Sequence, residues 1–176
     1  SLAVSKSDFT CADVGENTVT LTVTDNNGNV DTLTAVVTVE DNVLPVPVTK
    51  PITVQLDSTG NTAITPQHIN DGSSDACSIS DLSIDISSFT CADVGGNTVT
   101  LSVTDDNDNV LTSSSTVTVE DNVKPVVITQ DITVQLDAAG DVSITTADID
   151  NGSSDACGMS LALDITAFTC AEVGAN

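Results

Sequence analysis

The 176-residue sequence contains no arginine and only three lysines, against 26 aspartates and glutamates, so its formal net charge is -23. Proteins that bind nucleic acids neutralise phosphates with lysine and arginine, and this composition therefore excludes that class. The same shortage argues against docking on anionic membranes, and no apolar run approaches the roughly 20 residues of a membrane span. We expect a water-facing chain with no direct membrane insertion.

Aromatic residues are also scarce, with three phenylalanines and no tyrosine or tryptophan. The hydrophobic fraction is nevertheless 39%, and most of it is Val, Ile, Leu and Ala. A disordered acidic chain would contain far fewer β-branched residues. The composition therefore predicts a folded chain that is rich in β-strands.

Internal repetition is the strongest signal in the sequence. Blocks that begin at Phe9, Asn17, Thr38, Ile52 and Ser73 return about 80 residues later, and the phenylalanine block returns once more at Phe168 to Gly174. That period is too long for a solenoid coil and is typical of a small autonomous β-domain.

The junctions between repeats are predicted at Glu40 to Pro45 and Glu120 to Pro125, because polar residues there precede a proline that cannot continue a strand. Residues 1–41 are then the C-terminal half of one repeat, 42–121 a complete repeat and 122–176 the N-terminal half of another. We expect the sequence to be a window of a longer beads-on-a-string array.

Apolar residues alternate with polar ones in most segments, for example at Ile52, Val54 and Leu56. This period of two is typical of half-buried strands, and no segment has a convincing helical period. Turn-forming residues separate the segments at 57–61, 70–75, 95–97 and 105–109. Six or seven short strands in each repeat predict an all-β fold of tandem immunoglobulin-like sandwiches.

The spacing of the five cysteines predicts a Cys77–Cys91 and a Cys157–Cys170 disulfide, with Cys11 pairing to a residue before Ser1. Closing a loop of about 15 residues stabilises a small domain by roughly 3 kcal/mol. Disulfides require an oxidising compartment, so we expect an exported protein. Metal-binding or reactive thiols are the alternative, but the chain has one histidine and no CxxC motif.

Acidic residues gather in the segments that a sandwich topology would bring to each junction. Convergent carboxylates favour a hard cation with oxygen ligands, and calcium is the natural candidate outside the cell. The arrangement resembles the calcium-stiffened linkers of cadherins. The alternative is that these are ordinary turns. The predicted ligands are Glu40, Asp41, Asn42, Asp71, Asp75, Asp105, Asp106, Asp108, Glu120, Asp121, Asn122, Asp150 and Asp155.

The run from Phe89 through Asp105, followed by an Asp-Asn hairpin and Thr118 to Val123, resembles the tandem repeats of very large Bacteroidetes surface proteins, such as the flavobacterial gliding-motility adhesin. More distantly, it is similar to hyalin-type (HYR) repeats, although it lacks their usual tyrosine. The resemblance implies export by the type IX route and an outer-membrane-attached adhesive filament. The implied partners are neighbouring repeats, surface glycans and other filament subunits.

Three functional classes remain to be compared. An enzyme is not expected: the single histidine, His68, is interpreted as a surface strand residue, Asp148 stands in its place in the next repeat, and no nucleophile elbow or zinc motif is present. A carbohydrate- or protein-binding module of a secreted multidomain protein is the alternative, but sugar binding usually needs exposed aromatic rings. The sequence therefore favours a structural and adhesive stalk.

Overall fold

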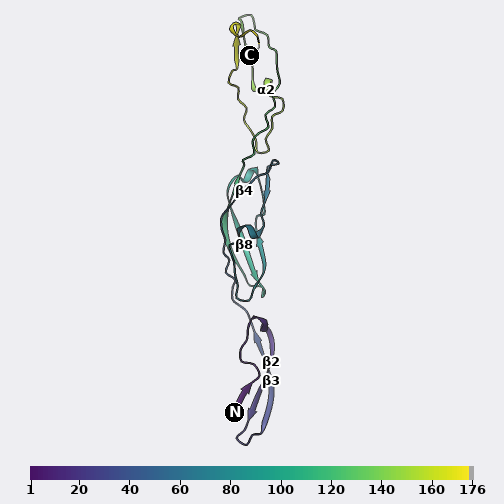
Figure 1. Ribbon diagram of the computed structural model, residues 1–176, viewed down its shortest axis with the longest axis vertical. Helices are drawn as coiled ribbons and strands as arrows, with labels where there is room; N and C mark the ends of the chain where they lie inside the picture. Colours follow the sequence, from purple (N-terminus) through teal and green to yellow (C-terminus); the bar gives the residue numbers. More distant parts are fainter. Residues whose placement is uncertain (175–176) are drawn as a thin grey trace. The chain divides into compact units, whose positions relative to one another are not determined.

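The computed structural model describes residues 1–174, and the last two residues of the third predicted segment, 175–176, lie outside them. The fold is mostly β, with several antiparallel sheets (Figure 1), and the described residues include two one-turn α-helices and three short 3-10 helices. An all-β chain was predicted, and this is confirmed. Among the described residues, no helix has the length and apolar character needed to cross a membrane.

The chain divides into two compact units. The first contains Ser1–Ile52, Ile64–Ser87 and Thr98–Thr116, and the second contains Thr53–Ala63, Ser88–Asn97 and Val117–Asn176. Three strands, β4, β8 and β9, contribute residues to both units.

The first unit begins with a three-stranded antiparallel sheet of β1 (Leu2–Val4), β2 (Gly15–Thr24) and β3 (Val30–Val39) in that spatial order. β2 and β3 form a hairpin, and Asp25 closes its turn by accepting hydrogen bonds from the backbone N–H groups of Asn27 and Asn29 at 2.8 Å. Leu21 and Val23 on β2 remain 40% and 43% exposed, so this sheet leaves much of its apolar face in water.

A four-stranded sheet has the order β4-β9-β8-β6, formed by β4 (Ile52–Gln55), β9 (Val110–Glu120), β8 (Gly95–Asp105) and β6 (Ile79–Ile84). Alternate side chains along its two long strands, β8 and β9, are buried and form the core. Val99, Leu101 and Val103 on β8 are fully buried, as is Val117 on β9. Leu101 and Leu21 occupy equivalent repeat positions, and Leu101 in the complete repeat is fully buried whereas Leu21 in the partial repeat is 40% exposed.

Two short antiparallel strand pairs recur in the second unit: β5 (Asn61–Ala63) pairs with β7 (Ser88–Thr90), and β10 (Asp141–Ser143) pairs with β11 (Ala167–Thr169). Each phenylalanine block contains a short 3-10 helix: η1 (Cys11–Asp13), η2 (Cys91–Asp93) and η3 (Cys170–Glu172). Phe89 is buried, whereas Phe9 and Phe168 are only half-buried.

Two one-turn helices, α1 (Pro66–Ile69) and α2 (Thr146–Ile149), were not predicted. Each is preceded by a capping threonine, Thr65 or Thr145, whose N–H is accepted by the side chain three residues later: His68 Nδ1 at 2.9 Å in α1 and Asp148 Oδ2 at 2.7 Å in α2. The interpretation of His68 as a strand residue is therefore wrong. A single turn held by local capping is too short to give a helical period.

A further prediction of local structure is wrong. Residues 95–97 were expected to form a turn, but β8 begins at Gly95, and Asn97 Nδ2 holds the strand entrance by donating to the Asp93 and Gly95 carbonyls. Residues 132–135 match the sequence of β4 but form no strand. β4 pairs with β9, and no described strand pairs with 132–135, so the alternating pattern alone does not produce a ladder there.

Candidate cation sites and disulfides

The disulfides join Cys11 to Cys77 and Cys91 to Cys157. Both have a sequence separation of 66, with Cα–Cα distances of 5.2 and 5.1 Å, and each lies within one compact unit. Cys170 is free and exposed. The predicted Cys77–Cys91 and Cys157–Cys170 pairs are therefore wrong, and so is the expectation that Cys11 pairs outside the chain.

Strand length explains why near neighbours in sequence do not pair. Cys77 lies two residues before Ile79, which is opposite Asp105 at the end of β8, whereas Cys91 lies just before Gly95 at the beginning of the same strand. The 11 residues of β8 span about 35 Å. Two cysteines whose Cα atoms are more than about 7 Å apart cannot form a disulfide.

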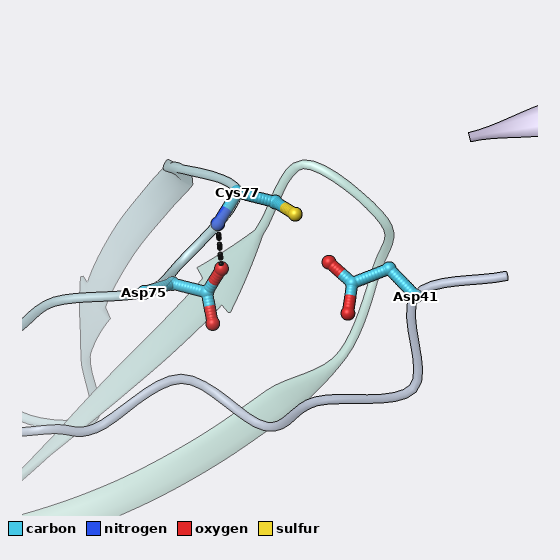
Figure 2. Close-up of side chains that lie close together, drawn as sticks. All are labelled: Asp41, Asp75 and Cys77. Atoms are coloured by element: carbon cyan, nitrogen blue, oxygen red, sulfur yellow. Dashed lines mark hydrogen bonds between the residues drawn. The ribbon is translucent and has the colours of Figure 1, made fainter. Parts of the chain in front are cut away.

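Beside the first disulfide, the structure brings together two carboxylates from distant segments, Asp41 after β3 and Asp75 before Cys77 (Figure 2). One oxygen of each residue and Cys77 Sγ all lie within 4.8 Å of one another. We call Asp41, Asp75 and Cys77 the first acidic cluster. The sulfur is part of the Cys11–Cys77 disulfide, so the two carboxylates are its only anionic groups.

Half of the carboxylate oxygens in the first acidic cluster are used by the backbone. Asp75 Oδ2 accepts the N–H of Cys77 at 2.6 Å, and Asp41 Oδ1 accepts the N–H of Val43 at 3.0 Å. The other two oxygens, Asp75 Oδ1 and Asp41 Oδ2, are buried and have no hydrogen-bond partner among the described residues. Burying a carboxylate oxygen without a partner destabilises the folded chain. A hydrogen-bond donor or a cation at these two atoms would remove that cost.

The β8–β9 hairpin of the same unit holds Asp41 in place from one side, because Asn109 Nδ2 donates to the Asp41 carbonyl at 3.0 Å. Asp105 is fully buried, and its carboxylate accepts the N–H groups of Asn107 and Asn109 and the side-chain amide of Asn109, each at 2.8 Å. Burial acts to raise the pKa of Asp105, but these hydrogen bonds outweigh it, and the pKa lies below its ordinary value. Asp105 is therefore a turn residue with its acceptors occupied.

The second unit contains an equivalent group, the second acidic cluster, formed by Asp121, Asp155 and Cys157 with the same 4.8 Å limit. Asp155 Oδ1 accepts the N–H of Cys157 at 2.8 Å, and Asp121 Oδ1 accepts the N–H of Val123 at 3.0 Å. One difference is local charge. Lys124 and Asp155 line the same shallow surface depression, whereas Leu44 takes the place of Lys124 beside the first cluster.

The other predicted acidic ligands belong to neither cluster. Asp71 forms an exposed ion pair with Lys50 at 3.5 Å. Asp150 accepts the N–H of Ser153 at 3.0 Å as part of a turn. Asp106 and Asp108 are exposed in the hairpin.

The predicted linker residues Glu40, Asn42, Glu120 and Asn122 are exposed and hydrogen-bonded to one another or to a neighbour. Asn42 donates to Glu40 at 3.3 Å, and Gln55 donates to Glu120 at 2.7 Å. Of the predicted ligands, each acidic cluster therefore contains one linker aspartate (Asp41 or Asp121) and one turn aspartate (Asp75 or Asp155). The repeated Asp-Ala-Cys motif was the signal that could have identified the turn aspartate.

Comparison with protein-family models and with curated proteins found no match to this chain.

Proposed function

We propose that this chain is part of an extracellular stalk or filament, built of tandem immunoglobulin-like sandwich repeats, that holds an adhesive region of a bacterial surface protein away from the cell. The observation that carries the proposal is a feature that occurs twice, which we call the disulfide joint. It consists of a disulfide between cysteines 66 residues apart and an Asp-Asp pair beside the second cysteine. A joint that recurs with the sequence period suits a spacer. A receptor would need one distinctive site.

Composition supports the same proposal. Disulfides persist in oxidising, extracellular surroundings. A net charge of -23 keeps long surface arrays soluble and apart. Outer-membrane attachment, type IX export and a role in gliding motility remain proposals that rest on the resemblance to Bacteroidetes adhesin repeats.

Within this proposal, calcium binds at the acidic clusters. Its support is that the carboxylates of Asp41 and Asp75 lie close together, that each keeps one buried oxygen without a partner, and that among the described residues no lysine forms an ion pair with either. Calcium takes six to eight oxygens at about 2.3 to 2.6 Å, so the two carboxylates supply part of the shell, and backbone carbonyls and water would complete it. Because Asp41 lies in the linker and Asp75 in the following repeat, the ion would stiffen the junction.

The calcium proposal is tested by thermal unfolding and isothermal titration calorimetry of the oxidised chain. At a free calcium concentration of about 100 times Kd, each occupied site is expected to raise the free energy of unfolding by about 2.7 kcal/mol. Asp41→Asn and Asp75→Asn each remove the calcium effect from the first cluster. Asp31→Asn, which removes one charge from the exposed face of β3, is the matched control and leaves the effect intact.

Sodium chloride at matched ionic strength separates binding from screening, because a chain with a charge of -23 is stabilised by any salt. An equal rise in melting temperature with either salt would show that the clusters are turns and would overturn the calcium proposal. A sugar-binding module is the alternative function, and saturable binding of the chain to a glycan array would support it against the stalk.

A further inference from the structure

The two disulfides change which part of the chain can carry tension. Cys11 lies in the predicted first repeat and Cys77 in the second, and Cys91 and Cys157 join the second to the third in the same way. Each disulfide therefore closes a loop that crosses a predicted junction, at residues 12–76 and 92–156. We propose that the disulfides form a covalent bypass, which makes the chain a tether that cannot be unravelled by pulling.

The load path follows from connectivity alone. Tension that enters at Ser1 runs along the backbone to Cys11, crosses the first disulfide to Cys77, continues to Cys91 and crosses the second disulfide to Cys157. Residues 12–76 and 92–156 lie outside that path and cannot be drawn out while the disulfides are intact. Most of the chain is therefore shielded from force, including both junction segments with Asp41 and Asp121.

The segment that carries the load between the two disulfides is residues 77–91, which contains β6 and β7. Fully extended, its roughly 15 residues reach about 50 Å. A repeat of about 80 residues without the bypass could reach about 280 Å. The folded segment already runs beside β8, whose length is about 35 Å, so complete unfolding would lengthen the load path only slightly.

Cys170 marks where the same pattern recurs. In the third phenylalanine block it occupies the position that Cys11 and Cys91 have in the first two, and its Sγ lies 3.8 Å from the Gly140 carbonyl, as Cys91 Sγ lies 3.8 Å from that of Gly60. Its exposed thiol also provides a natural attachment point for a pulling handle. The bypass rests on the disulfides alone and does not depend on calcium or on an adhesive role.

Single-molecule force spectroscopy tests the bypass, with one handle on the Ser1 amino group and the other coupled to the Cys170 thiol as a thioether. The oxidised chain is expected to stop extending at about 150 Å, whatever the calcium concentration. The double variant Cys11→Ser with Cys77→Ser extends about 220 Å further, and so does Cys91→Ser with Cys157→Ser. Removing both disulfides gives about 590 Å.

The extension limit depends on covalent connectivity, so it is informative even if a variant does not fold. Ser58→Ala, inside the first bypassed loop, is the control and leaves the limit unchanged. A limit of the oxidised wild-type chain above about 500 Å would overturn the proposal, since that length requires residues 12–76 and 92–156 to be drawn out. If calcium has no specific effect on thermal unfolding of the wild-type chain and the extension limit is still about 150 Å, the calcium site is refuted and the bypass is supported.

Discussion

At the scale of single residues, the disulfide joint depends on a glycine that precedes β5. Gly60 has φ +77°, and a Cβ placed there would lie 2.6 Å from Cys91 Sγ and 3.3 Å from Ala156 Cβ. The sulfur is fixed in the Cys91–Cys157 disulfide and cannot move aside. Gly140 has the same relation to Cys170, at 2.7 Å. The position therefore needs glycine both for its backbone conformation and for its close approach to sulfur.

The substitution Gly60→Ala tests this packing. Gly72→Ala is the matched control, because Gly72 has φ +89° and nothing within 4 Å of the added Cβ. Both changes incur the backbone cost of about 1 to 2 kcal/mol for a left-handed alanine. Only Gly60→Ala also displaces the disulfide, so we expect a larger fall in its melting temperature and a lower yield of the Cys91–Cys157 pair in peptide mapping. Equal effects of the two substitutions would contradict the close contact.

At the scale of elements, the short helices show how one backbone requirement is met by different side chains. Position three of α1 is His68 and of α2 is Asp148, and each accepts the N–H of the preceding threonine cap. Helix capping explains why histidine and aspartate can replace one another at this position. Either side chain supplies an acceptor at the same distance along the turn.

Exchanging these side chains is the test at this scale. His68→Asp is expected to preserve the melting temperature, because aspartate already fills the role in α2. His68→Leu removes the acceptor and should cost about 1 kcal/mol of the free energy of unfolding. Chemical denaturation of the two variants measures the difference. A stable His68→Leu protein would mean that the packing of the buried Ile69 holds α1 without the cap.

At the scale of the whole molecule, two electrostatic effects oppose one another. The net charge of -23 repels itself, and this repulsion weakens as carboxylates are protonated. In the other direction, turn aspartates are held by hydrogen bonds that need the charged form. A hydrogen bond from the Thr59 side chain, with others from the Asn61 and Thr59 backbone, holds the pKa of Asp57 below its ordinary value, and the N–H groups of Asp141 and Ala139 do the same for Asp137.

These lowered pKa values determine the direction of the acid response. A carboxyl group with a lower pKa in the folded chain stabilises it fully above the unfolded value, near 3.8, and this stability is lost as the pH falls through the folded value. As the pH is lowered from 7 to about 5, we expect the melting temperature to rise slightly, because the repulsion between carboxylates weakens. Below about pH 3.5 we expect it to fall steeply, because the turn hydrogen bonds are lost. Thermal unfolding in calcium-free buffers across this pH range measures the melting temperature. A melting temperature that keeps rising below pH 3 would contradict the turn hydrogen bonds.

Much of the local structure could be predicted from sequence because it depends on neighbouring residues. The period of about 80 residues, the β class and the acidic turns all follow from composition, alternation or turn chemistry. The turns at Asp57 and Asp105 form as predicted because each aspartate accepts hydrogen bonds from the N–H groups two and four residues further on.

The tertiary structure alone decided which distant groups meet. Cys77 and Cys91 are close in sequence but lie toward opposite ends of β8, so each bonds a cysteine 66 residues away. Among the acidic residues that the structure describes, Asp41 with Asp75 and Asp121 with Asp155 are the pairs that come together beside a disulfide. Strand 52–55 forms whereas 132–135 does not, because a ladder needs a partner strand that no local pattern supplies.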